Sequence, residues 1–202
     1  AGTCTIQGTS AASPIINSGI IGSTSYSHSN VGGIVGYGSA GTTLRYVRNS
    51  NAVRNNTGSR TGGIIGYAYG TNISYANNLG GAVQSSGEYV GGIAGEVYET
   101  GSDVLTGCTN SGSVQGTNCV GGIAGKVTGS STHATTICEN QAAGTVTGTS
   151  YVGGIIGYAV NTMTINGAKN YAPVTGAASG QFVGGIAGRI DSPAKILSCT
   201  NS

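Results

Sequence analysis

Four arginines, Arg45, Arg48, Arg54 and Arg60, lie within one short stretch of the chain, and Tyr46 stands beside the first. A guanidinium group offers a planar set of N–H donors that matches a carboxylate or sulfate with two parallel hydrogen bonds. A neighbouring aromatic ring adds flat apolar surface. These five residues therefore form a candidate ligand surface that could bind sulfated or sialylated glycans. Oppositely charged patches could equally dock neighbouring molecules side by side. The favoured interpretation is a surface that only keeps a charge-poor chain soluble.

Acidic residues are too few to predict catalysis. Enzymes that cleave polysaccharides need paired carboxylates, or carboxylates combined with a basic residue or calcium. Glu96, Glu99 and Asp103 lie close in sequence, with Glu88 just before them, and form the one candidate cation or general-acid site. A solvated loop is the favoured interpretation. The two histidines, His28 and His133, are far apart, and nothing places them beside a nucleophile. The sequence predicts no catalytic residue, no metal site and no cofactor.

Three of the five cysteines share one position of a repeat with two alanines: Cys108, Cys138 and Cys199 with Ala76 and Ala168. Exchange with alanine is typical of a small buried residue. Cys108 and Cys138 should stack on adjacent coils, where a disulfide is conceivable, but inward thiols with poor bonding geometry are the favoured interpretation. Cys119 takes the position of Tyr89, Tyr151 and Phe182. No CxxC pair exists to suggest zinc.

These residues are positioned by a repeat of about thirty residues, a period typical of solenoids. The hexapeptide VGGIAG or a near copy occupies residues 31–36, 61–66, 90–95, 120–125, 152–157 and 183–188. Short apolar–polar alternations bounded by Gly, Asn, Ser and Thr predict strands and turns, without helices. We predict an all-β fold: a single right-handed parallel β-helix of about six and a half coils, each with two or three short strands.

A second block of the repeat places an asparagine in one phase of every coil: Asn17, Asn49, Asn78, Asn110, Asn140, Asn170 and Asn201. Asparagine tolerates left-handed turns, and stacked amides can bond up and down a ladder, so we predict a structural ladder. Three apolar ranks should form the core: Ile34/Ile64/Ile93/Ile123/Ile155/Ile186, Val53/Val83/Val114/Val146/Val174 and Leu44/Ile73/Leu105/Ile165/Ile196. A row of tyrosines after the hexapeptide could contact sugar rings or another protein, or cover a corner: Tyr37, Tyr67 and Tyr158.

Composition limits the partners. The net charge is +2 and only 7% of the 202 residues are charged, which argues against nucleic acid as a partner. No apolar stretch is long enough to span a bilayer, so no membrane insertion of this segment is expected. Both ends of the chain cut through a repeat unit. We therefore expect residues 1–202 to be one repeat array from a longer chain, with adjoining repeats or domains as partners.

The hexapeptide followed by an aromatic residue, as in VGGIVGY from Val31, and the block CTNSGSVQG from Cys108 resemble the GLUG-type repeats. Those repeats occur in bacterial secreted and cell-surface proteins, including adhesin-like proteins and IgA-specific metallopeptidases. The resemblance implies a surface-exposed, adhesin-like β-solenoid segment of a bacterial protein, secreted or at the cell surface. The chain lacks the HExxH zinc motif, so no protease activity carries over.

The favoured function is therefore a non-catalytic extracellular segment that serves as a stiff stalk, as a binding surface for a host or environmental glycan or surface protein, or as both. One alternative is an ice-binding solenoid, which needs a regular file of Thr. Here the file is broken, because Thr42 and Thr71 are followed in phase by Asp103, His133, Met163 and Ala194. The other alternative is a carbohydrate-active enzyme, which the scarcity of carboxylates disfavours.

Overall fold

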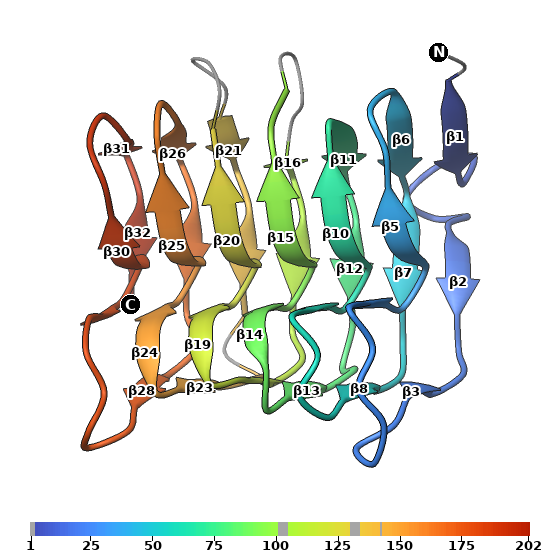
Figure 1. Ribbon diagram of the computed structural model, residues 1–202. Coiled ribbons are helices and arrows are strands. Elements are labelled where there is room, and N and C mark those ends of the chain that lie inside the picture. The colour runs from blue at the N-terminus through green and yellow to red at the C-terminus, as the bar shows by residue number, and fades with distance from the viewer. Residues whose placement is uncertain (1–2, 101–104, 130–133, 142) are drawn as a thin grey trace.

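The computed structural model describes residues 3–100, 105–129, 134–141 and 143–202. All regular structure in these residues is β-strand. The chain winds through five short strands per coil, and equivalent strands of successive coils pair in parallel to form five sheets of six or seven strands (Figure 1). The predicted all-β parallel solenoid is confirmed.

The predicted number of strands per coil was wrong, because each coil contains five strands and not two or three. The coil bends sharply at single residues, which divides the expected longer strands. Tyr46, for example, has φ of 51° and turns the chain between two strands without any loop. Such left-handed positions usually carry glycine or asparagine, so a tyrosine gave no signal of a bend.

The first and second sheets follow one another along the coil. The strands of the first sheet are β1 (Cys4–Gln7), β6 (Thr42–Arg45), β11 (Thr71–Ser74), β16 (Leu105–Thr106), β21 (Ala134–Thr136), β26 (Thr164–Asn166) and β31 (Lys195–Leu197). The strands of the second sheet are β2 (Ile15–Asn17), β7 (Val47–Asn49), β12 (Asn77–Asn78), β17 (Thr109–Asn110), β22 (Glu139–Asn140), β27 (Lys169–Asn170) and β32 (Thr200–Asn201).

The remaining three sheets complete the coil. The third contains β3 (Ile21–Gly22), β8 (Val53–Asn55), β13 (Val83–Ser85), β18 (Val114–Gln115), β23 (Val146–Gly148) and β28 (Val174–Gly176). The fourth contains β4 (Asn30–Gly32), β9 (Arg60–Gly62), β14 (Glu88–Gly91), β19 (Asn118–Gly121), β24 (Ser150–Gly153) and β29 (Val183–Gly184). The fifth contains β5 (Val35–Gly38), β10 (Ile65–Tyr69), β15 (Ala94–Tyr98), β20 (Ala124–Thr128), β25 (Ile156–Val160) and β30 (Ala187–Ile190).

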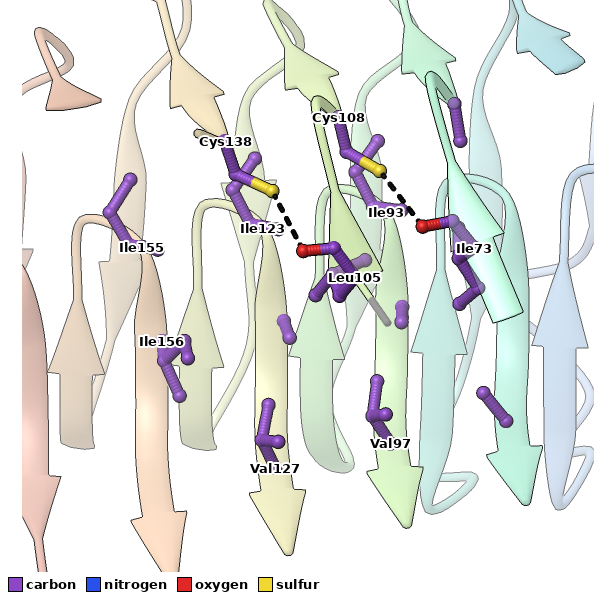
Figure 2. Packing of buried hydrophobic residues seen from close by; sticks show 14 of the residues in the cluster. Ile73, Ile93, Val97, Leu105, Cys108, Ile123, Val127, Cys138, Ile155 and Ile156 are labelled. Carbon is purple, nitrogen blue, oxygen red and sulfur yellow. Dashed lines mark hydrogen bonds between the residues drawn. The ribbon is translucent and has the colours of Figure 1, made fainter. Parts of the chain in front are cut away.

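Two apolar clusters fill the inside of the coil. The larger contains the isoleucines of the hexapeptide and those of the first sheet, and Figure 2 shows part of it. The smaller is made of valines from the third and fourth sheets. All three predicted ranks belong to the interior in the middle coils, where Ile93, Val114 and Ile73 have no exposed surface. Burial of one such side chain contributes roughly 1.5–3 kcal/mol to folding.

The predicted asparagine ladder is confirmed. The Nδ2 of each asparagine before Asn201 donates to the Oδ1 of the asparagine in the next coil, as from Asn78 to Asn110 at 2.8 Å and from Asn110 to Asn140 at 2.9 Å. The second Nδ2 hydrogen of Asn110 is donated to the carbonyl oxygen of Gly112 at 2.8 Å. Because both hydrogens have acceptors, the amide can be fully buried without the penalty of an unpaired polar group.

The ladder lies against the second glycine of each hexapeptide. A Cβ at Gly92 would come within 2.4 Å of the Cγ of Asn110 and 2.2 Å of the carbonyl oxygen of Gly122. Val90, before the glycine pair, belongs to the smaller apolar cluster, and Ile93, after it, belongs to the larger. The amides therefore cross the coil between the two clusters, and the glycine pair is required for close approach of backbone to amide.

The stacked cysteines are free thiols inside the larger cluster. Figure 2 shows the Sγ of Cys108 and that of Cys138 directed at carbonyl oxygens of the preceding coil, Ile73 at 3.9 Å and Leu105 at 3.6 Å. The hydrogen bond with the Cys108 thiol, followed by burial, raises the pKa of Cys138 well above its ordinary value. Burial likewise raises the pKa of Cys119 to about 12.

We expect these thiols to differ sharply in reactivity, because alkylation requires an accessible thiolate. Cys4 is exposed and Cys199 is half-buried, whereas Cys108, Cys119 and Cys138 are buried. With iodoacetamide at pH 8, Cys4 should be modified first and Cys199 more slowly. The three buried thiols should react only as fast as the protein unfolds, and all should react together in denaturant. Rapid labelling of Cys108 or Cys138 in the native protein would contradict this placement.

Candidate binding surface

The structure distributes the four arginines of the predicted ligand surface over four sheets. Arg45 ends β6, Arg48 lies in β7, Arg54 lies in β8 and Arg60 begins β9. The coil turns at each junction, so the side chains leave the solenoid in different directions. Of the predicted residues, Arg45 and Tyr46 contact each other, at the corner where the first sheet meets the second, and Arg48 lies two residues beyond this corner in β7.

Arg45 is held at this corner by two aromatic rings. Its Nη2 donates to the Tyr46 hydroxyl at 2.9 Å. Its guanidinium carbon lies 4.7 Å from the ring centroid of Tyr46 and 5.7 Å from that of Tyr75, in the next coil. The two rings stack with centroids 5.4 Å apart and planes inclined by 19°. Such cation–π contacts orient the guanidinium without neutralising its charge.

Tyr75 was missed by the sequence analysis, although it is the residue that extends the corner. It has a positive φ of 53°, close to the 51° of Tyr46 in the equivalent position, and the residue is 44% exposed. Its ring covers Gly107 in the following coil, where a Cβ would lie 2.8 Å from the ring carbon Cε1. The sequence did contain a signal, because the equivalent position of three successive coils is occupied by Tyr46, Tyr75 and Gly107.

Beside this corner, the outer face of the first sheet is hollowed into a depression of about 430 Å³. Its lining combines hydroxyl and amide side chains with one guanidinium and one aromatic ring: Gln7, Thr43, Arg45, Asn72, Ile73, Ser74, Tyr75 and Thr106. Two further depressions, of about 330 and 380 Å³, are lined by residues of the last and first described coils. Ligand sites commonly enclose volumes of this order and combine an apolar surface with a few polar groups.

The corner keeps positive charge that the protein does not neutralise. The ion pairs among the described residues are Arg60–Glu96, Lys126–Glu96, Lys169–Glu139 and Arg189–Asp191. Neither Arg45 nor Arg48 takes part in any of them. The Nε atoms of both arginines are enclosed and have no hydrogen-bond acceptor among the residues that the structure describes.

Arg60, by contrast, is engaged on the opposite side of the coil. Its guanidinium carbon lies 4.3 Å from the ring centroid of Tyr67, and its Nε is paired with Glu96. Lys126 lies 3.1 Å from the other oxygen of the same carboxylate and 5.0 Å from the ring centroid of Tyr89. This ion pair between successive coils stabilises the outer face of the fifth sheet, and its charges are already satisfied.

We expect Glu96→Gln to lower the free energy of unfolding by about 1–2 kcal/mol, because the mutation leaves two cations beside a neutral amide. The Glu96 side chain is only 6% exposed. A matched control is Glu139→Gln, whose carboxylate side chain is 33% exposed and pairs with Lys169 at 3.3 Å. Its expected change is within about 0.5 kcal/mol. Equal effects of the two substitutions in chemical denaturation would contradict a special role for Glu96.

The predicted tyrosine row is in register but interrupted. Tyr37, Tyr67, Glu96, Lys126, Tyr158 and Arg189 follow one another on the outer face of the fifth sheet. At its end, the Tyr158 hydroxyl donates to Asp191, which Arg189 also contacts at 2.9 Å. The Tyr158 hydroxyl, followed by the Arg189 guanidinium, holds the pKa of Asp191 below its ordinary value.

The candidate acidic site is only partly assembled. Glu96 is paired as described, the side chain of Glu99 is buried, and Glu88 is exposed. Asp103 and His133 lie outside the described residues. Among the residues that are described, no group of three metal-ligating side chains is found.

The file of Thr considered for ice binding is interrupted. Thr42 and Thr71 pair in register on the first sheet, but Met163 and Ala194 take the equivalent position in later coils, as the pairing of the following residues shows. Thr42, Thr71 and Met163 are all buried. This position therefore offers ice no flat row of threonines in the part of the chain that the structure describes.

Comparison with known structures supports the fold. The chain is similar to the crystal structure of a putative immunoglobulin A1 protease from Bacteroides ovatus, with a TM-score of 0.68 and 24% sequence identity. The match covers 92% of this chain and 56% of that protein's chain, so the chain spans little more than half of the structure that it matches. No protein-family model matches the chain, and the curated proteins give no significant match. The resemblance to GLUG-type repeats stays a prediction.

No helix capable of crossing a lipid bilayer occurs in the described parts of the chain.

Proposed function

We propose that this chain is a non-catalytic, adhesin-like repeat segment that works outside a bacterial cell as a stiff rod and binds glycans at the depression beside Arg45. The observation that carries the proposal is the combination of side chains there. A positioned guanidinium, a partly exposed tyrosine ring and several hydroxyl and amide groups line one shallow site. Sugars offer hydroxyl groups to such polar side chains and a C–H face to an aromatic ring.

The rod supplies stiffness. Every coil hydrogen-bonds to the next through five parallel sheets, and the asparagine ladder joins the coils internally. The backbone positions that carry the outer side chains are therefore fixed relative to one another, which lowers the entropy lost when a ligand is bound.

The absence of a catalytic role is part of the proposal, and the state of the carboxylates supports it. Among the described carboxylates, Glu96, Glu139 and Asp191 each contact a cation, Glu99 is buried, and Glu88 alone is exposed outside an ion pair. A glycosidase of the usual kind needs two carboxyl groups that face one bond of the substrate.

A tyrosine substitution tests the site directly. We expect Tyr75→Ala to weaken glycan binding about tenfold, because it removes the ring that forms one wall of the depression. The matched control is Tyr98→Ala, on the fifth sheet. Tyr98 is 38% exposed, close to the 44% of Tyr75, and its ring stacks on Tyr69 with centroids 5.4 Å apart.

Binding is measured first on a broad glycan array and then by calorimetry with the glycans that bind. Equal losses in the two variants would place the binding site elsewhere on the rod. A folded chain that binds no glycan on the array would overturn the proposed function and leave a spacer rod.

A further inference from the structure

We infer that the depression beside Arg45 takes an acidic sugar, whose carboxylate or sulfate group pairs with the Arg45 guanidinium while the sugar ring lies against Tyr75. This inference rests on the proposed glycan-binding function and names the class of glycan. It assigns anion binding to Arg45 and not to the other arginines of the same coil. The sequence alone gave no reason to prefer one of these arginines.

Unneutralised charge is the first argument. Arg45 ends a strand of the first sheet, and none of the described carboxylates pairs with it. Arg48 lies two residues after the corner residue Tyr46 and likewise forms no ion pair among the described residues. Two half-buried cations near one corner attract an anion more strongly than a fully exposed cation does, because solvent screens them less.

Orientation is the second argument. The Arg45 guanidinium lies over the Tyr46 ring, and its Nη2 already donates to the Tyr46 hydroxyl. The group is thus fixed in place by neutral partners, which leaves its charge for a ligand. A planar guanidinium group that is held in place recognises a carboxylate or sulfate through two parallel hydrogen bonds.

The lining of the depression is the third argument, because it fits a sugar better than an isolated inorganic anion. Gln7, Thr43 and Ser74 offer polar groups around Arg45, and Tyr75 offers apolar surface. A simple anion could accept hydrogen bonds from the guanidinium and from nearby hydroxyl or amide groups, but it would leave the apolar surface of Tyr75 uncovered. A sugar acid uses the charged group and the surrounding polar and aromatic side chains together.

Arg54 provides a matched control within the same coil. It lies in β8 on the third sheet, is exposed and takes part in no cation–π contact among the described residues. Arg54→Gln removes the same charge from the same coil as Arg45→Gln, but at a position without the aromatic support or the depression. Any effect of overall charge on binding should therefore be equal in the two variants.

The experiment uses paired probes on the folded chain: a glycan ending in sialic acid with its desialylated form, and a sulfated disaccharide with its unsulfated form. We expect each acidic member that binds to do so about tenfold or more tightly than its neutral counterpart, and more weakly as salt is added. Arg45→Gln should remove this preference, whereas Arg54→Gln should change it less than about twofold. Cooperative thermal melting of both variants shows that they are folded.

The two pairs separate the two sources of charge: a preference within the first pair alone identifies a carboxylate, and one within the second pair alone identifies a sulfate. Either result supports the inference. Equal binding of acidic and neutral members, with no change in Arg45→Gln, would overturn it while leaving the proposed glycan binding intact. An equal loss in the Arg45 and Arg54 variants would also overturn it. Failure to bind any probe or any array glycan would overturn the proposed function itself.

Discussion

Gly122→Ala should lower the free energy of unfolding by about 3 kcal/mol or more, because the added methyl group has no room beside the asparagine ladder. A Cβ at Gly122 would lie 2.1 Å from the carbonyl oxygen of Gly154 and 2.3 Å from the Nδ2 of Asn140. Neither atom can withdraw easily, because the carbonyl belongs to the backbone of the next coil and the amide is held in the ladder. The coils would have to separate locally, which would break hydrogen bonds between them.

The matched control for this substitution is Gly19→Ala. A Cβ at Gly19 would meet only the Oδ1 of Asn17, at 3.7 Å, which is an ordinary contact. The expected change is within about 1 kcal/mol and stabilising, because alanine restricts the unfolded chain more than glycine does. Urea denaturation followed by circular dichroism and tyrosine fluorescence measures both, and coincident transitions establish that unfolding is cooperative. A Gly122→Ala protein as stable as the parent would show that the close approach at the glycine pair is wrong.

Asn110→Ala is expected to lower the free energy of unfolding by about 3 kcal/mol, because it breaks buried hydrogen bonds of the asparagine ladder. The Asn110 amide donates to Asn140 and to the Gly112 carbonyl, and its Oδ1 accepts from Asn78. Alanine leaves one Nδ2 hydrogen of Asn78 without an acceptor and removes the ladder donor to the Oδ1 of Asn140, both at buried positions. A single buried polar atom without a partner costs roughly 1–3 kcal/mol, so the ladder is more sensitive in its middle than at its ends.

Asn201→Ala tests this dependence on position. Asn201 is exposed and accepts one ladder bond, from Asn170 at 2.7 Å, so its loss should cost less than about 1 kcal/mol. Denaturation of both variants under identical conditions gives the comparison. If the two alanine substitutions cost the same, the ladder stabilises the coils independently of burial, and hydrogen bonding to buried neighbours is not the cause.

Only part of the candidate site could be predicted from the sequence, as the four arginines show. The period of the repeat by itself places all four arginines in one coil: Arg45, Arg48, Arg54 and Arg60. Which of them share a face depends on the direction of the chain after each bend. Tyr46 makes one of those bends with a positive φ, which nothing in its side chain indicates. The grouping of Arg45 with Tyr75, and of Arg60 with Glu96, was therefore invisible in the sequence.

The sequence by itself determined the solenoid, the asparagine ladder and the three apolar ranks. Each of these repeats a local pattern in every coil, and residues in the same phase must stack once the strands pair in parallel. The tertiary structure alone decided that a coil has five strands, which outward side chains meet, and where the outer face is hollowed. These features depend on bends at single residues and on coils whose length varies, from 29 residues between Asn49 and Asn78 to 32 between Asn78 and Asn110. The inside of the rod is thus specified by repetition, whereas its outer surface is specified by departures from repetition.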